Sequence, residues 1–398
     1  MVNISVMSLP IYMDHHSTTP VDERVLTAML PFFLQEFGNA SSRTHPYGWR
    51  AAEAVEHARG QVAALVGAET KEVVFTSGAT ESINVALIGA ARNFRGKKDH
   101  VVTCVTEHSA TLDTCKYLQS DGIRVTYLPV QPDGTLDLEL LRAAVDDGTF
   151  LISLMHANNE VGTVHPVEKV GEIAEAAGVL FHVDAAQSCG RIALKILAAN
   201  IDLLSISAHK LYGPKGVGAL VVRRRTPRMR IAPLHHGGGH ERGIRPGTLN
   251  VPGIVGLGAA CDIALREMEG EALRLRALRD RLLGKLQAQI DGVSVNGTME
   301  NRLPNNLNVS FAGVEGESLI VALRDVAAVS SGSACTSAKQ EPSHVLAAMG
   351  ISKELVHSSI RFGLGRANTP EQVDLVAEQV AGAVKRLRGL GLAAAQNE

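Results

Sequence analysis

Lys210 has the surroundings that most favour reactive chemistry in this sequence. It follows an apolar run at residues 201–207 and precedes LYGPKG, a turn rich in glycine and proline. A lysine that is held rigidly and partly dehydrated loses its proton more readily than a surface lysine, and such an amine suits Schiff-base chemistry. A lysine taken alone is more commonly a solvated loop residue, so its neighbours decide between the two interpretations.

Two further features stand at the ends of predicted strands. Asp184 ends the apolar run 179–184, and SGAT, which contains Ala79 and Thr80, joins a predicted strand to a helix. An open parallel sheet presents ligand-binding groups at its strand ends, and the free amides of a helix start bind anions. Pyridoxal 5'-phosphate requires an amine, an acid for its pyridine nitrogen and a phosphate site. Together the three features predict this cofactor.

The composition limits the classes of protein that the chain can represent. It has 398 residues, of which 45% are hydrophobic and 20% charged, and a net charge of -2. This length suggests two or three domains, and the balanced charge provides no basic footprint for nucleic acid. The first residues show no signal-peptide pattern, no run approaches the ~20 apolar residues of a membrane span, and the five cysteines include no CxxC pair. We therefore expect a cytoplasmic protein without a disulfide framework and without direct contact to nucleic acid or membrane.

Apolar runs alternate with helical patterns up to about residue 222. We predict helices at 21–37 and 49–66, and strands at 72–75, 100–105, 124–128, 150–155, 179–184, 203–207 and 218–222. This alternation predicts an α/β fold, with a mostly parallel, seven-stranded sheet that helices cover on both faces.

The remaining sequence predicts a smaller α+β domain. A long charged helix at 261–290 leads out of the sheet domain, and it is followed by strands at 307–311, 326–330 and 357–362 and helices at 316–323 and 370–387. The last residues, 392–398, show no pattern of regular structure. We expect a large domain of residues 15–262 and a small domain of residues 1–14 and 263–398, which carries a loop at 330–337.

His108 and Asn159 each follow a predicted strand, which places them at the same rim as Asp184 and Lys210. An imidazole at that rim could stack on a planar cofactor and move protons near neutral pH. The alternatives are a histidine that caps the next helix and an asparagine that forms a turn.

The segment HHGGGHERG at residues 235–243 contains three histidines, which are common zinc ligands. No carboxylate or cysteine at a suitable spacing completes a ligand set, so we expect no metal site there. The three consecutive glycines instead indicate backbone that approaches another surface closely. Beside them, Arg242, Arg245 and Thr248 could provide a phosphate contact to a neighbouring subunit.

Cys335 lies in SSGSACTS, residues 330–337, a stretch of small and polar residues. Such a stretch has no apolar anchor for a structural cysteine and suits an accessible thiolate, so we predict a nucleophile on a mobile loop. The alternative is that the cysteine stands in this stretch by chance and has no function. Arg361, in the predicted strand 357–362, is either an ordinary ion-pair residue or a bidentate ligand for the carboxylate of an amino-acid substrate.

Motifs along nearly the whole chain, from about residue 11 to 387, resemble the cysteine desulfurases of the iron-sulfur-cluster and nitrogen-fixation type, which are pyridoxal-phosphate enzymes of fold type I. The resemblance is carried by TSGATES, TEHSATLDTC, HANNEVG, FHVDAAQ, SAHKLYGPKG, HGGGHERGIRPGT, VEGES, SSGSACTS, EPSHVL and SSIRFGLGR. The long cysteine loop is similar to that of group I, whose loop is extended.

The resemblance implies a reaction and a set of roles. Sulfur would be removed from L-cysteine, giving L-alanine and a persulfide on Cys335 that passes to acceptors for iron-sulfur cluster assembly or tRNA thiolation. Lys210 would carry the cofactor and remove the α-proton, and His108 would stack on the ring and assist with protons. No resident metal is implied, although Cys335 could transiently ligate an iron-sulfur cluster. The other cofactor-binding residues would be Ala79, Thr80, Asn159, Asp184, Gln187, Ser207, His209 and, across a homodimer interface, Thr248; Asn159 and Arg361 would bind the substrate carboxylate.

Two alternatives and two differences from the family remain. A selenocysteine lyase or an aminotransferase would share Lys210 without needing the long cysteine loop, whereas an inactive sulfur carrier or scaffold partner would be expected to lose Lys210, His108 or Cys335.

His15 and His16 stand where relatives usually have a different pair, and we expect them to affect only the rim of the site. The sequence also stops before the longer extension with which housekeeping members contact the scaffold protein, which leaves that docking mode open, and it does not identify the sulfur acceptor.

Overall fold

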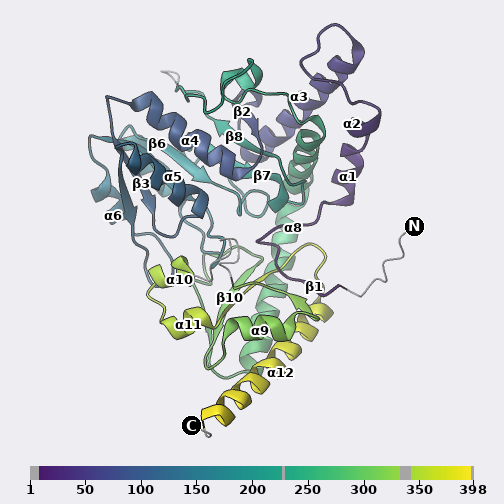
Figure 1. Ribbon diagram of the computed structural model, residues 1–398, viewed down its shortest axis with the longest axis vertical. Helices are drawn as coiled ribbons and strands as arrows, with labels where there is room; N and C mark the ends of the chain where they lie inside the picture. Colours follow the sequence, from purple (N-terminus) through teal and green to yellow (C-terminus); the bar gives the residue numbers. More distant parts are fainter. Residues whose placement is uncertain (1–8, 226–228, 332–341, 396–398) are drawn as a thin grey trace.

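A mostly parallel sheet forms the centre of the larger part of the molecule (Figure 1). The structure is a computed structural model that describes residues 9–225, 229–331 and 342–395. Within these residues a seven-stranded sheet has the order β2-β8-β7-β6-β5-β3-β4. Only β8 runs antiparallel to its neighbours, which confirms the predicted fold class. The strands are β2 (Val73–Thr76), β3 (His100–Cys104), β4 (Arg124–Leu128), β5 (Thr149–Met155), β6 (Leu180–Asp184), β7 (Leu203–Ser207) and β8 (Gly218–Val222).

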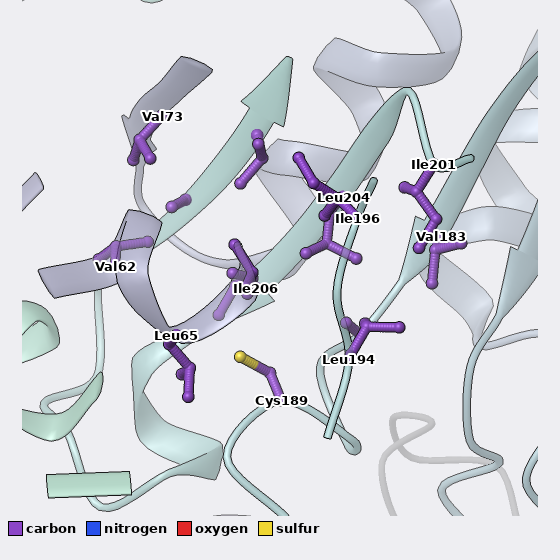
Figure 2. Close-up of a cluster of buried hydrophobic side chains, with 14 of the residues drawn as sticks. Val62, Leu65, Val73, Val183, Cys189, Leu194, Ile196, Ile201, Leu204 and Ile206 are labelled. Carbon is purple, nitrogen blue, oxygen red and sulfur yellow. The ribbon is translucent and has the colours of Figure 1, made fainter. Parts of the chain in front are cut away.

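The central strands are buried along their whole length, which explains why they appear in the sequence as continuous apolar runs. Helices cover the two faces of the sheet and form a hydrophobic cluster on each. One cluster includes Ile83 and Leu87; the other is seen in part in Figure 2, where side chains such as Val62, Val183 and Ile206 converge. The covering helices are α3 (Pro46–Val66), α4 (Ala79–Phe94), α5 (Ser109–Ser120), α6 (Leu138–Ala144), α7 (Val167–Ala176) and the first part of α8 (Val251–Gln289).

Several predicted helix limits are wrong, and capping explains most of the differences. The helix predicted at 21–37 is split into α1 (Glu23–Met29) and α2 (Pro31–Leu34), because Pro31 has no amide hydrogen to continue the first helix. The helix α3 begins at Pro46, three residues before the prediction, where His45 accepts a hydrogen bond from the amide of Gly48. The helix α8 begins at Val251 and not at 261, since Asn250 caps it through the amide of Gly253.

A third hydrophobic cluster lies around the far end of α8. It contains a three-stranded antiparallel sheet of β9 (Val293–Val295), β10 (Asn306–Phe311) and β12 (Ser359–Gly363), with α9 (Gly316–Leu323) and α12 (Pro370–Ala395) packed against it. Figure 1 shows α8 running from the large sheet into this part beside α12. A short parallel pair joins β1 (Ile11–Tyr12) to β11 (Ala327–Ala328), and the small helices α10 (His344–Ala348) and α11 (Lys353–His357) complete this part.

The second half of the chain also departs from the prediction in detail. The strand predicted at 357–362 starts two residues later, because His357 still belongs to α11. The predicted strand 326–330 is reduced to β11, with Ser330 in an isolated bridge to Arg361. The prediction that residues 392–398 have no regular structure is wrong for residues 392–395. The helix α12 continues to Ala395, because alanine favours helix. Within the described residues, no helix is long and apolar enough to cross a membrane.

Candidate active site

A cavity of about 550 Å³ opens where the large sheet presents the carboxyl ends of its strands. Its walls come from the segments that follow β2, β3, β5, β6 and β7, as expected for an open α/β sheet. The predicted cofactor residues that line it are Ala79, Thr80, His108, Asn159, Asp184, Gln187, Ser207, His209 and Lys210. Thus residues from five separate parts of the sequence converge on one site.

Lys210 lies in a short 3-10 helix, Ala208–Lys210, directly after β7. Its Nζ donates hydrogen bonds to the backbone carbonyls of His16 and Ser17, the second at 2.9 Å. The turn beyond it needs glycine, because a Cβ on Gly213 would lie 2.9 Å from the Cβ of Ala208. The lysine is therefore held between β7 and the N-terminal segment, with its amine at the cavity wall.

Asp184 is the last residue of β6 and is 6% exposed. One carboxylate oxygen accepts a hydrogen bond from the amide of Ala186 at 2.9 Å. Burial raises the pKa of Asp184, while that hydrogen bond and the nearby His108 and Lys210 act in the opposite direction. A buried acid of this kind gains from a cationic partner such as a protonated pyridine nitrogen, so the residue fits the predicted cofactor.

The start of α4 lies at the cavity, and its residues fit the predicted anion site. Its N-cap residue, Gly78, has φ 153° and no side-chain cap, so the first amides of the helix carry no capping acceptor from that residue. The opposite wall approaches closely, since a Cβ on Gly218 would lie 2.7 Å from the Cα of Gly78. Ser207 and His209 line the same cavity. This set of backbone amides, a hydroxyl and an imidazole fits a phosphate group.

His108 both caps a helix and lies at the cavity. It is the N-cap residue of α5, and its Nδ1 accepts a hydrogen bond from the amide of Ala110 at 3.1 Å. It also lines the cavity. Burial lowers the pKa of His108, and because Nδ1 is the acceptor, the neutral ring carries its proton on Nε2.

Asn158 and Asn159, which are adjacent in the sequence, have different positions: the first forms a turn and the second lines the cavity. Asn158 is the turn residue, since its Oδ1 accepts hydrogen bonds from the amides of Glu160 and Val161 at 2.8 and 3.0 Å. Asn159 lines the cavity. Its carbonyl accepts a hydrogen bond from Arg361 at 2.8 Å, which links the large sheet to the strand β12.

Arg361 is fully buried and lies behind the cavity wall, outside the set of lining residues. Its Nη2 donates to the Asp14 carboxylate at 2.8 Å and to the Ser17 hydroxyl at 2.9 Å. The arginine is thus in an ion pair on an edge strand, and it also contacts two residues, Ser17 and Asn159, that line the cavity.

Among the described site residues, Thr248 does not line the cavity either, and one further predicted residue is not among those described. Thr248 is an exposed residue. Cys335 lies outside the described residues, which include only Ser330 and Ser331 of the predicted loop.

The segment HHGGGHERG contributes contacts and no metal site in the part of the chain that the structure describes, where no three histidine, cysteine, aspartate or glutamate side chains lie close enough to hold an ion. His240 pairs its Nε2 with the Ser41 hydroxyl at 2.8 Å. Arg245 donates to the carboxylate of Glu81, in the first turn of α4, at 2.9 Å. This carboxylate also accepts from the amide of Ser77, so Arg245 supports the junction between β2 and α4.

Sequence reasoning missed several residues of the cavity wall. Ser17 and Thr18 come from the N-terminal segment, and Lys215 and Gly216 come from the turn after Lys210. The motif HHSTTP gave no signal of its own, because its residues approach the cavity only through tertiary contacts. Ser77 and Glu81 belong to the recognised TSGATES motif, which could have indicated them.

Comparisons with known proteins agree with this geometry. Residues 11–376 match the model of the aminotransferase class-V family. The cysteine desulfurase IscS of Anaeromyxobacter sp. (strain Fw109-5) is 60% identical over 382 residues, which cover 96% of this chain and 94% of the relative. That of Rickettsia africae (strain ESF-5) is 53% identical over 384 residues, covering 96% and 93%.

Solved structures agree as well. A NifS-like protein superposes with a TM-score of 0.89 and 40% identity, covering 95% of this chain and 100% of that one. SspA in complex with cysteine gives a TM-score of 0.79 and 37% identity, covering 89% and 98%. The chain therefore belongs to the aminotransferase class-V family. Within this family it groups with the cysteine desulfurases, enzymes of the sulfurtransferase type, which confirms the predicted resemblance and implies dependence on pyridoxal 5'-phosphate.

Proposed function

We propose that this chain removes sulfur from L-cysteine, releases L-alanine and retains the sulfur as a persulfide on Cys335. The observation that carries the proposal is the convergence of Lys210, Asp184 and the start of α4 on one cavity, in a chain 60% identical to a cysteine desulfurase. These residues offer the amine, the acid and the anion site that pyridoxal phosphate needs. The bound cofactor supplies an electron sink for the substrate α-carbon.

The residues of the chain would then act as follows. Lys210 Nζ takes the proton from the substrate α-carbon, and Asp184 holds a proton on the pyridine nitrogen. His108, with its ring proton on Nε2, would stack on the ring and pass protons at the cavity wall. Gln187 would contact the ring hydroxyl, and Ala79, Thr80, Ser207 and His209, which line the cavity, would hold the phosphate.

Substrate binding involves Asn159 and Arg361. Asn159 lines the cavity and would contact the substrate carboxylate; the Arg361 guanidinium, which contacts the Asn159 carbonyl from behind the wall, is the cation assigned to the same carboxylate. The thiolate of Cys335 attacks the substrate sulfur and a sulfur-sulfur bond forms. The bond between that sulfur and the substrate β-carbon breaks, and the β-carbon retains the electron pair and takes a proton, which leaves alanine.

The domain division and the dimer belong to the same proposal. The boundary at residue 262 is supported by α8. Its residues Val251–Ala264 pack in a cluster on the large sheet, whereas Leu275–Leu286 pack in the third cluster, around the far end of the helix.

A homodimer is supported by the exposure of Thr248, which would reach the phosphate of the partner subunit. A monomer by light scattering that still binds the cofactor fully would contradict the dimer.

The experiment compares the protein with Cys335→Ala and with Cys115→Ala. Cys115 is buried in α5, and burial raises its pKa to about 12, so it is the control for the loss of an unreactive thiol. After L-cysteine is added, alanine and sulfide are assayed together with the visible absorbance. We expect a yellow protein that forms both products in the wild type and the control, and no turnover in Cys335→Ala.

The other outcomes point to other enzymes. A yellow Cys335→Ala variant that releases sulfide as fast as the wild type would favour a selenocysteine lyase or another fold type I enzyme. A colourless protein would overturn the cofactor assignment. The sulfur acceptor, an iron-sulfur scaffold protein or a tRNA-thiolation relay, would be identified by transfer of labelled sulfur from the persulfide.

A further inference from the structure

His16 is a buried histidine whose ring contacts the wall of the cavity. The residue is 2% exposed, and its Nδ1 lies 2.9 Å from Oε1 of Gln187. In return, Nε2 of Gln187 donates to the backbone carbonyl of His16 at 3.0 Å. The two residues therefore share two hydrogen bonds, one through the imidazole and one through the main chain.

The main-chain contact determines how the Gln187 amide is oriented. A carbonyl oxygen only accepts hydrogen bonds, so the amide nitrogen of Gln187 must face the carbonyl of His16. The amide oxygen then faces Nδ1 of His16, and because this oxygen is also only an acceptor, Nδ1 must carry the ring proton. A reversed amide would set two oxygens against each other.

The surroundings keep His16 in the neutral form that this arrangement requires. Burial lowers the pKa of His16 well below its ordinary value, and the cations Arg361, Arg191 and Lys210 lower it further, whereas the bond to Gln187 acts in the opposite direction. The other ring nitrogen, Nε2, is buried and has no hydrogen-bond partner in the described residues, so nothing there competes for the proton. The single ring proton is thus committed to Gln187.

We propose that His16 is a positioning residue that locks the Gln187 amide, so that Gln187 presents an N–H donor and not its oxygen to the cavity. The amide nitrogen has two hydrogens, and one is used by the His16 carbonyl, which leaves the other for the cavity that Gln187 lines. This inference rests on the proposed function, in which Gln187 contacts the ring hydroxyl of pyridoxal phosphate. A fixed donor at that position favours the ionised form of the ring oxygen.

The neighbouring histidine provides a matched control. His15 is also buried, at 4% exposed, and burial lowers its pKa to about 4. Its Nδ1 pairs with the carbonyl of Gly363 at 3.0 Å and not with Gln187. Loss of this imidazole removes a buried ring of the same size without freeing the Gln187 amide.

The experiment uses four full-length proteins: the wild type, His16→Leu, His16→Asn and His15→Leu. Apoprotein is titrated with pyridoxal 5'-phosphate to obtain the dissociation constant, and the visible band of the loaded protein is titrated with pH. His16→Leu removes the ring N–H that donates to Oε1 of Gln187, whereas the side-chain amide in His16→Asn places a donor at about the position of Nδ1. Without this hydrogen bond the Gln187 amide is no longer held with its N–H toward the ring oxygen; a ring oxygen that has lost its donor makes the neighbouring protonated nitrogen less acidic, so the midpoint of the band should rise.

We expect His16→Leu to raise that midpoint by roughly half a pH unit or more and to weaken cofactor binding about threefold to tenfold. His16→Asn and His15→Leu should stay near the wild type in both measurements. If His16→Leu does not fold, His16→Ser takes its place, because its hydroxyl is too short to reach Gln187. Equal shifts in the His16 and His15 variants, or no shift in either, would overturn the inference, whereas a wild type without a visible band would instead overturn the proposed function.

Discussion

The guanidinium of Arg361 donates to the carboxylate of Asp14 across 2.8 Å, although 347 positions separate the two residues in the sequence. The same oxygen of Asp14 accepts a hydrogen bond from the hydroxyl of Ser330 at 3.1 Å. Ser330 in turn bridges Arg361 through the backbone, with the amide of Arg361 donating to the Ser330 carbonyl at 2.7 Å. Asp14 thus fixes the arginine that is proposed to bind the substrate and the first residue of the predicted cysteine loop.

Asp14→Asn should weaken substrate binding more than it slows turnover. The asparagine keeps the size of the side chain but loses the charge that holds the fully buried Arg361, so the guanidinium is less well oriented. We expect KM for L-cysteine to rise about tenfold with a smaller change in kcat, and the free energy of unfolding to fall by about 3 kcal/mol. Steady-state kinetics and urea denaturation measure the two effects, and an unchanged KM would contradict this role.

Lys210→Ala should abolish turnover while leaving the fold intact. The Lys210 amine is the proposed base and cofactor anchor, and loss of a general base costs about 100- to 10,000-fold in rate. Lys215→Ala is the control, because Lys215 lines the same cavity but is exposed and follows the turn. Alanine production and the visible absorbance are measured for both. Comparable loss in the two variants would show that positive charge, and not the Lys210 amine, is what matters.

Gly218→Ala should disturb the phosphate site as well as the fold. The added Cβ would lie 2.4 Å from the carbonyl oxygen of Ile206 and 2.7 Å from the Cα of Gly78, and both are backbone atoms that cannot rotate away. We expect a loss of about 2 kcal/mol in the free energy of unfolding and weaker binding of pyridoxal phosphate.

The control for this substitution is Gly60→Ala, in the interior of α3. A Cβ there meets no atom within 4 Å, so alanine should stabilise the helix by about 0.5 to 1 kcal/mol. Chemical denaturation and cofactor titration compare the two variants. A Gly218 variant as stable as the wild type, with unchanged cofactor affinity, would exclude the close approach described above.

The free energy of unfolding should fall as the pH drops below 6.5, and His165 should contribute to the fall. Burial lowers the pKa of His165 to about 4. Between its folded and unfolded pKa values the unfolded chain binds the extra proton, so acid favours unfolding over this range. From pH 7 to pH 5 this one residue should account for about 2 kcal/mol.

The variant His165→Leu tests this pH dependence. Neither ring nitrogen of His165 has a hydrogen-bond partner in the described residues, so leucine removes the titration without breaking a bond of the ring. We expect the variant to lose about 2 kcal/mol less than the wild type between pH 7 and pH 5 in urea denaturation. An equal loss in both proteins would mean that His165 does not titrate on unfolding.

The sequence predicted the large sheet because each of its strands is a local apolar run, and the same runs marked where the chemistry lies. Lys210 and Asp184 could be assigned to the site since both stand at or just beyond the end of such a run, and parallel strands bring these ends together. Helix limits were less predictable: α8 starts at Val251 because of a cap at Asn250, and Pro31 splits a pattern that otherwise reads as one helix.

Only the tertiary structure brought the N-terminal segment to the site. The contacts of Asp14, His16 and Ser17 have no local signal in the sequence, because they are made with Arg361, Gln187 and Lys210, which are distant in sequence. His16 illustrates the difference: the sequence marked it as an unusual residue at the rim, and the fold placed it in contact with Gln187. Hydrophobic periodicity is a local property that a sequence reveals, whereas a hydrogen bond between distant segments exists only once the chain has folded.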